Sequence, residues 1–209
     1  MDRLELLVEF ILQSDKIERI NDNRTLLEEQ IRGNKPDGHV GAILFLEKLA
    51  ENQDRFLTEE DIKKVQGLIT AEQESKDPNL KLQSKHIGEY SDEDRAVHGR
   101  RCRTAVEIQV YMMSLAERVA CLQKNWRTMT ELAVIGEIAG FYFDFEIIHP
   151  FKDGNGRTGR AIVFYLMKFI GRTPFIFTEE EMYLHHFSSL GSGQREVMQK
   201  YFWDKSGLF

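Results

Sequence analysis

The chain has 209 residues, of which 42% are hydrophobic and 30% are charged. This length suits one domain, or one domain with a helical extension, and the composition is that of an ordinary soluble globular protein. The formal net charge of −6 argues against a surface dedicated to nucleic acid. No apolar run approaches the roughly 20 residues that a membrane-spanning helix needs, so we expect no membrane partner.

The start of the chain and its cysteines bear on the compartment. Met1 to Leu7 carries charges among its apolar positions and lacks a cleavage-like site of small residues. Cys102 and Cys121 show neither metal-ligand spacing nor a disulfide framework, which suits a reducing environment. We therefore expect a cytoplasmic location, with export by a specialised secretion system left open.

Two helical patterns come first in chain order. Asp2 is a suitable N-cap for an amphipathic helix, whose buried face would be formed by Leu4, Leu7, Val8 and Ile11. A second pattern follows closely, with Ile17, Ile20, Leu27 and Ile31. The turn-forming stretch 33–38 then breaks the chain, and this break divides it into an N-terminal helical segment, 1–36, and a main domain, 37–209.

Asp15 and Glu18 lie between these two patterns with the spacing of a capping box. This spacing favours a second helix that begins here, with Glu18 as a first-turn carboxylate that the helix dipole stabilises.

Further helical patterns alternate with turn signals along the rest of the chain. Val40, Ile43 and Leu44 predict one helix, and the capping box Thr58–Asp61 opens another. Residues 71–104 are polar without a sustained helical period, so we expect a loop there. A long helix follows to about Lys124, and a capping box at residues 128–131 begins the next one. These patterns predict an all-α fold.

The twelve residues from His149 to Arg160 lie between two helical patterns and combine a histidine, an acid, three glycines, an amide and two arginines. Pro150 disfavours the helical conformation at His149, so the first helix should end there. Gly154 and Gly156 permit close approach of an anion to backbone amides, and the following helix presents its N-terminus. This composition predicts a phosphate site.

The charged residues of this stretch fit the same interpretation. Arg157 and Arg160 are three residues apart on one helical turn, close enough to bind the same oxygens. Asp153 would repel phosphates unless a divalent cation lies between them, since hard cations bridge carboxylate and phosphate oxygens. Each residue alone also has an ordinary structural explanation, but nine specified residues at fixed spacing are a much stronger signal.

The segment HPFKDGNGRTGR resembles the signature of the Fic family, His-Pro-Phe-x-(Asp/Glu)-Gly-Asn-Gly-Arg-x-x-Arg, at every specified position. The resemblance implies a Fic-type helical bundle with a small β-hairpin flap, in which 37–209 is the catalytic domain. It also implies a protein adenylyltransferase that moves AMP from ATP, with Mg²⁺, to a Ser, Thr or Tyr hydroxyl of a target protein. A homodimer is left open.

The resemblance also implies a role for each residue of the motif. His149 would be the catalytic base, Asp153 would hold the metal, and the nucleotide would be bound by Gly154, Asn155, Gly156, Arg157 and Arg160. The family would place its flap in the loop, best at residues 96–103, and its adenine pocket near Tyr183.

Ser14 and Glu18 resemble the inhibitory pattern (Ser/Thr)-x-x-x-Glu-(Gly/Asn) that many Fic proteins carry on a helix. Arg19 departs from this pattern, which expects Gly or Asn. The alternatives are a Fic enzyme that removes AMP or transfers another phosphate-containing group, and a nucleotide-binding regulatory module with little turnover.

Overall fold

The computed structural model describes residues 1–208 except 21–22, 77–81, 83, 95 and 98–99. Its α-helices are α1 Arg3–Ile17, α2 Arg24–Arg32, α3 Gly38–Glu51, α4 Glu59–Lys76, α5 Ala105–Asn125, α6 Glu131–Ile148, α7 Asn155–Phe169, α8 Glu179–Glu181, α9 Phe187–Ser192 and α10 Arg195–Lys205. Two 3₁₀ turns, Ser84–His86 and Trp126–Thr128, and a π-helical turn, Met182–His186, connect them. The strands are β1 Ala96–Val97 and β2 Arg100–Arg101.

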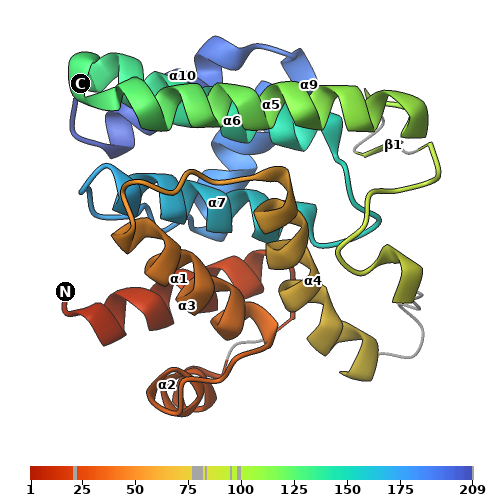
Figure 1. Ribbon diagram of the computed structural model, residues 1–209, viewed down its shortest axis with the longest axis vertical. Coiled ribbons are helices and arrows are strands. Elements are labelled where there is room, and N and C mark those ends of the chain that lie inside the picture. Colours follow the sequence, from red (N-terminus) through yellow and green to blue (C-terminus); the bar gives the residue numbers. More distant parts are fainter. Residues whose placement is uncertain (21–22, 77–81, 83, 95, 98–99, 209) are drawn as a thin grey trace.

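Helix α7 lies at the centre of the molecule. It packs against α3 and α4 on one side and α6 on the other, and Figure 1 shows it between a layer of α5, α6 and α10 and a layer of α1, α3 and α4. Its residues from Ala161 to Met167 are all buried, because neighbouring helices cover every face. The loop that precedes α7 is therefore attached to the most enclosed element of the fold.

Both predicted segments contribute to one hydrophobic core. Leu7 and Val8 of α1 are fully buried and belong to the same cluster as Ile43 of α3 and Phe164 of α7. Phe10 and Phe164 place their ring centroids 4.9 Å apart. The division at residue 36 stays a prediction, but α1 packs as part of the core.

The first helix is longer than its sequence pattern indicated. Asp2 is the N-cap, as predicted, but α1 continues through Asp15 to Ile17. Helix α2 begins at Arg24, where the side chain of Asn23 accepts a hydrogen bond from the amide of Leu26. The predicted capping box at Asp15 and Glu18 is therefore wrong, because Glu18 caps the C-terminus of α1.

Other helix ends also differ in part from the prediction. The capping box at Thr58 and Asp61 is confirmed, but α4 extends to Lys76 into the stretch that was expected to be a loop. Helix α6 begins at Glu131 with Thr130, not Thr128, as its N-cap, because a 3₁₀ turn occupies residues 126–128.

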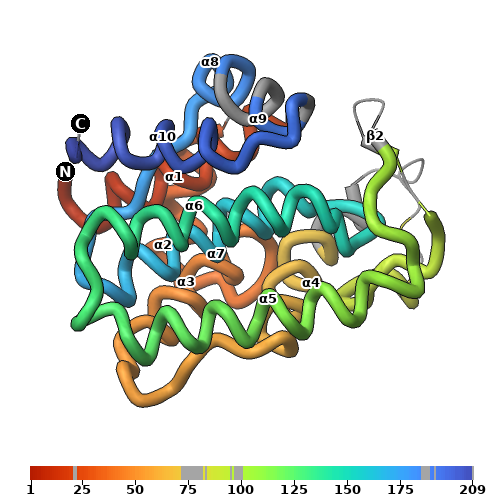
Figure 2. Tube along the Cα trace, turned by 90° about the horizontal axis from the view of Figure 1, so that it is seen from above, coloured from red at the N-terminus to blue at the C-terminus, as the bar shows by residue number. Residues whose placement is uncertain are grey.

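Strands β1 and β2 pair antiparallel, with Ala96 opposite Arg101 and Val97 opposite Arg100. Two residues on each side do not make the expected flap, so that part of the fold prediction is not confirmed. Both ends of the chain lie on the side of the molecule opposite this pair, as Figures 1 and 2 show together.

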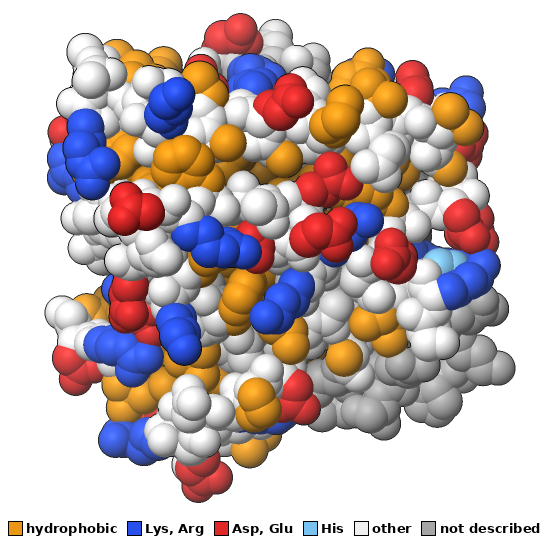
Figure 3. Space-filling view, in the orientation of Figure 1, with side chains coloured by type: hydrophobic (Ala, Val, Ile, Leu, Met, Phe, Trp, Pro, Cys, Tyr) orange, Lys and Arg blue, Asp and Glu red, His pale blue; other side chains and the backbone are white. Residues whose placement is uncertain are grey.

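The surface carries charges of both signs. On the face shown in Figure 3, acidic and basic side chains alternate among the described residues. None of the helices in the described part of the chain is long and apolar enough to cross a bilayer.

Candidate active site

His149 lies at the end of α6 in a left-handed backbone conformation, with φ 52° and ψ 58°. Its amide still donates to the carbonyl of Phe145 at 2.9 Å, so it is the residue at which the helix ends. Pro150 follows and cannot continue the helix. The imidazole remains 16% exposed, which leaves it accessible next to the loop.

The loop after His149 is fixed by Phe151. The Phe151 side chain is fully buried, and its backbone forms an antiparallel bridge with Tyr90. The side chain of Asn155 accepts from the amide of Phe151 at 2.9 Å and donates to its carbonyl at 2.8 Å. Asn155 thus shapes the loop, and its predicted contact with phosphate stays a prediction.

Two glycines keep open the space at the start of α7. Gly154 has φ 78°, and an added Cβ would lie 2.8 Å from the side chain of Thr70. A Cβ on Gly156 would lie 2.5 Å from Oε1 of Glu18. Gly154 is needed for the turn, and Gly156 for the approach of an anion to the helix N-terminus.

Arg157 and Arg160 are both buried on the first turns of α7, with 3% and 1% of their surface exposed. Burial lowers the pKa of Arg157, although Asp153 and other nearby carboxylates oppose this. Burial also disfavours the charged form of Arg160, but Glu18, together with Tyr142 and Glu146, outweighs this effect and raises the Arg160 pKa. Two buried cations at a helix N-terminus favour an anion there.

An anion of the chain itself occupies this position. Nη2 of Arg160 donates to Oε1 of Glu18 at 2.8 Å and to the carbonyl of Ser14 at 3.1 Å, while Nε donates to Oγ of Ser14 at 2.9 Å. Burial alone would raise the pKa of Glu18, but the charge and hydrogen bond of Arg160, with Arg157 and His149, lower it overall. The structure thus brings Ser14 and Glu18 to the predicted site from 142 to 146 residues away.

Asp153 lies at the open side of the loop with 37% of its side chain exposed. Its Oδ1 accepts from the amide of Gly154 at 2.7 Å, and its Oδ2 lies 3.9 Å from Arg157. Among the described residues, no three acidic, histidine or cysteine side chains are grouped so that they could hold a metal ion by themselves. A single carboxylate still fits Mg²⁺, which typically binds one or two carboxylates together with substrate phosphates.

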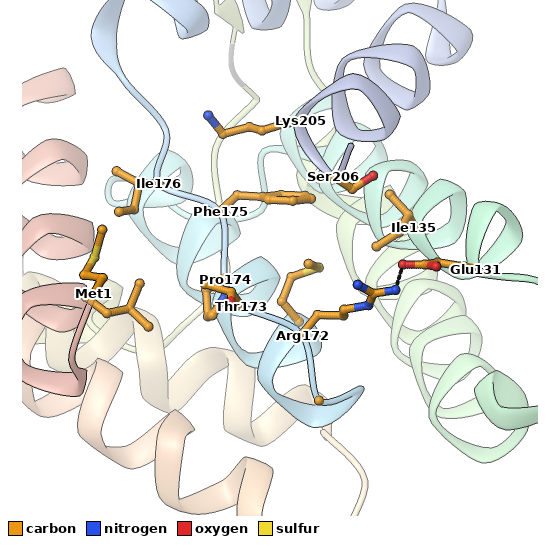
Figure 4. Close-up of a pocket in the computed structure, with 13 residues that line it drawn as sticks. Met1, Glu131, Ile135, Arg172, Thr173, Pro174, Phe175, Ile176, Lys205 and Ser206 are labelled. Carbon is orange, nitrogen blue, oxygen red and sulfur yellow. Dashed lines mark hydrogen bonds and ion pairs between the residues drawn. The ribbon is translucent and has the colours of Figure 1, made fainter. Parts of the chain in front are cut away.

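Tyr183 lies in the π-helical turn and is 73% exposed. A separate cavity of about 510 Å³ lies near the other end of α7, where Met167 and Gly171 line it. Figure 4 shows the ion pair between Arg172 and Glu131 at its edge. Because the motif begins α7 and this cavity adjoins its end, the cavity is not part of the phosphate site.

Two features near the site were missed from the sequence. Nδ1 of buried His39 donates a hydrogen bond to Oδ1 of Asp15 at 2.7 Å, which fixes the end of α1 to α3. Glu146 is buried within 4.0 Å of Nδ1 of His149. Its position three residues before His149 on one helix face was a signal in the sequence that could have identified it.

Comparison with known proteins agrees with this geometry. The profile of the Fic/DOC family matches residues 56–167, which is more than half of the chain and includes the whole motif. A protein from Aquifex aeolicus (strain VF5) named as a probable protein adenylyltransferase is 32% identical over 77 residues. These residues are 36% of this chain and 24% of that protein, so the match covers about a quarter of the relative.

Solved structures share the fold at low sequence identity. A Fic domain-containing signaling protein from Bacteroides thetaiotaomicron has a TM-score of 0.73 and 17% identity, with 98% of this chain and 83% of that chain covered. Fic-1 from C. elegans has a TM-score of 0.71 and 18% identity, with 100% of this chain and 62% of that chain covered. At these identities the likeness shows the fold alone, whereas the profile match extends to the motif. By that match the chain belongs to the Fic/DOC family.

Proposed function

We propose that this chain is a protein adenylyltransferase, which transfers AMP from ATP to a Ser, Thr or Tyr hydroxyl of a target protein. One observation carries the proposal. The carboxylate of Glu18 already lies on Arg160, beside Gly156 at the N-terminus of α7, where the motif predicts the outer phosphates. A site that holds one anion by an arginine and a helix N-terminus has the chemistry to hold another.

The motif residues fit in-line transfer. His149 removes the proton from the target hydroxyl while the hydroxyl oxygen attacks the α-phosphorus of ATP. The bond from that phosphorus to the bridging oxygen breaks, and pyrophosphate leaves. Arg157 and Arg160 orient the phosphates, and Asp153 is the carboxylate that would hold Mg²⁺. The metal would neutralise charge that develops on the phosphate oxygens.

We further propose that Glu18 inhibits this transfer. While Glu18 occupies Arg160, the guanidinium is unavailable to the γ-phosphate. ATP can then bind only with its phosphates displaced, and a small misplacement costs about 10²-fold in rate. The contact of Ser14 with the same arginine supports this role, because it holds the end of α1 over the site.

The experiment is intact-mass spectrometry after incubation with ATP and Mg²⁺. Wild type and Glu18→Gly would be compared, alone and with lysate proteins as targets. We expect the protein mass to increase by one AMP per labelled site. A larger fraction of the protein should be labelled with Glu18→Gly, and no labelling should be detected with His149→Ala. Loss of the base should cost about 10²- to 10⁴-fold but leave nucleotide binding largely intact.

Other outcomes separate the alternatives. Nucleotide that binds without any adduct in either protein would favour a regulatory binding module, for which the occupied site in this structure is the supporting observation. A mass increase other than AMP would indicate transfer of another group. Loss of AMP from a labelled target would indicate that the site removes the modification.

A further inference from the structure

Glu146 is a buried acid to which the mechanism above gives no role. It lies one helical turn before His149 on α6 and is 7% exposed. Its Oε1 is fully enclosed and has no hydrogen-bond partner among the described residues. Burying a carboxyl group without partners is costly, so its place beside the base requires an explanation.

The residues around Glu146 leave space for its carboxyl group. A Cβ on Gly159 of α7 would lie 3.0 Å from Oε1, so the glycine makes room for the carboxyl group. The other carboxylate oxygen, Oε2, lies 4.0 Å from Nδ1 of His149. This distance exceeds the roughly 3.2 Å limit of an N–H···O hydrogen bond, so the pairing requires the two side chains to move closer together.

We propose that Glu146 is a positioning residue for His149: the Glu146 carboxylate accepts a hydrogen bond from Nδ1–H, so that Nε2 is the unprotonated nitrogen that takes the proton of the target hydroxyl. This inference rests on the proposed function for the step that it assists. A neutral imidazole carries one proton, and the hydrogen bond at one nitrogen decides which nitrogen carries it. The Glu146 carboxylate would also stabilise the imidazolium that forms during transfer.

The protonation state of Glu146 decides between two forms of the pair. An ionised Glu146 accepts from Nδ1–H, which makes Nε2 the base. A protonated Glu146 donates to Nδ1 instead, which places the proton on Nε2 and removes the base. Glu146 and His149 together therefore have a working form and an idle form.

Charged and titratable groups on α7, at the end of α1 and on α6 affect the protonation state of Glu146. They are Arg160 of α7, Glu18 at the end of α1, and His149 and Tyr142 at either side of Glu146 on its own helix. Burial raises the pKa of Glu146 to about 8, the charge of Arg160 opposes this rise, and Glu18 adds to it. The working form is therefore gained as the pH rises through about 8, and removal of Glu18 should shift that gain to lower pH.

The direct test is nitrogen NMR of ¹⁵N-histidine-labelled, nucleotide-free protein between about pH 7 and 9. For His149 in wild type we expect the Nε2–H tautomer at the lower pH and the Nδ1–H tautomer at the higher pH. Glu18→Gly should move this change to lower pH, and Glu146→Gln should abolish it. Asp144→Asn is the matched control, because it removes a carboxylate from the same helix two residues away and should leave the change intact.

A kinetic test uses Glu18→Gly as the parent. Addition of Glu146→Gln should slow AMP transfer about 10-fold or more, but less than His149→Ala, which should cost about 10²- to 10⁴-fold. The KM for ATP should not change, since Glu146 is placed to act on the base and not on the nucleotide. A pH–rate profile should lose its rise near pH 8 in the same variant.

The outcomes for the two proposals can be told apart. One tautomer of His149 at every pH in wild type and Glu18→Gly would overturn the role of Glu146, even if AMP transfer is observed and even if Glu146→Gln does not fold. A tautomer change that follows Glu146, without AMP transfer in any variant, would support the pairing and contradict the proposed function.

Discussion

The backbone conformation of Arg19 explains why the inhibitory pattern has Gly or Asn at this position. It follows Glu18 with φ 56°, a left-handed conformation that Gly and Asn adopt most readily. Its amide donates to Lys16 and the amide of Ile20 donates to Asp15, which are the paired bonds of a Schellman helix end. The pattern's Gly or Asn is thus a requirement of helix termination, and Arg19 meets it with some strain.

Arg19→Asn should relieve this strain. We expect the free energy of unfolding in urea to rise by about 1 kcal/mol, since the left-handed conformation costs most residues about that much. A firmer end of α1 should also slow self-labelling. Arg32→Asn is the control, because Arg32 is the last residue of α2 and does not have a positive φ, so that this substitution should bring no gain. A lower stability for Arg19→Asn would contradict the assignment of strain.

Asp153→Ala tests whether the Asp153 carboxylate binds Mg²⁺. Loss of the carboxylate should reduce AMP transfer at low Mg²⁺, and added Mg²⁺ should partly restore it because the phosphates remain as ligands. Transfer would be measured across a Mg²⁺ titration, with the exposed Asp92→Ala as control. Superimposable curves for Asp153→Ala and wild type would exclude Asp153 as the metal ligand.

At the scale of elements, the contact between α6 and α7 sets the site geometry. Gly159 lies where a Cβ would meet Glu146, Phe145 and Tyr142 at 3.0 to 3.1 Å. The rings of Phe145 and Tyr142 are fully buried. The close approach of the two helices therefore brings Glu146, His149 and Arg160 together.

Gly159→Ala should push these helices apart. Overpacking of this kind costs about 1–3 kcal/mol, so we expect a lower midpoint in urea and slower transfer. Gly136→Ala is the matched control on α6, because its added Cβ would lie farther from its neighbours, 3.3 to 3.5 Å from the side chains of Trp203 and Gln199. Equal stability of the two variants would contradict a tight contact between α6 and α7.

Helix α1 is the second element that sets the state of the site. Asp15 fixes it to His39 of α3, and Ser14 and Glu18 fix it to Arg160 of α7. These three contacts all lie in the last turn of α1 and its C-cap. Separation of this end of α1 from α3 and α7 would therefore remove the Glu18 carboxylate and the contacts of Ser14 and Asp15 together.

For the whole molecule, the sequence indicated those features that depend on neighbouring residues. Pro150 ended α6 at His149, and the fold is all-α as predicted. The motif spacing also placed Arg157 and Arg160 together, because one helical turn determines it. Local patterns were sufficient for these features.

Local patterns did not predict the features that depend on distant residues, and only the resemblance to the inhibitory pattern linked Ser14 and Glu18 to the site. The spacing of Asp15 and Glu18 matched a capping box, but the partners that decide their roles are His39 and Arg160 in other helices. Tertiary contacts therefore overrode a local signal. The spacing of Glu146 from His149 was a signal in the sequence, but Glu146 was missed because the burial that gives it its chemistry is not visible in a single sequence.

The central claim is that Glu18 on Arg160 holds back AMP transfer, and labelled ATP tests it directly. Wild type, Glu18→Gly and Glu18→Gly with Arg160→Ala would be incubated with ATP labelled at the α-phosphate or at the γ-phosphate. We predict that protein-bound label from α-labelled ATP rises with Glu18→Gly, that Arg160→Ala removes the gain, and that γ-labelled ATP leaves none. Equal α-label in wild type and Glu18→Gly would contradict the claim.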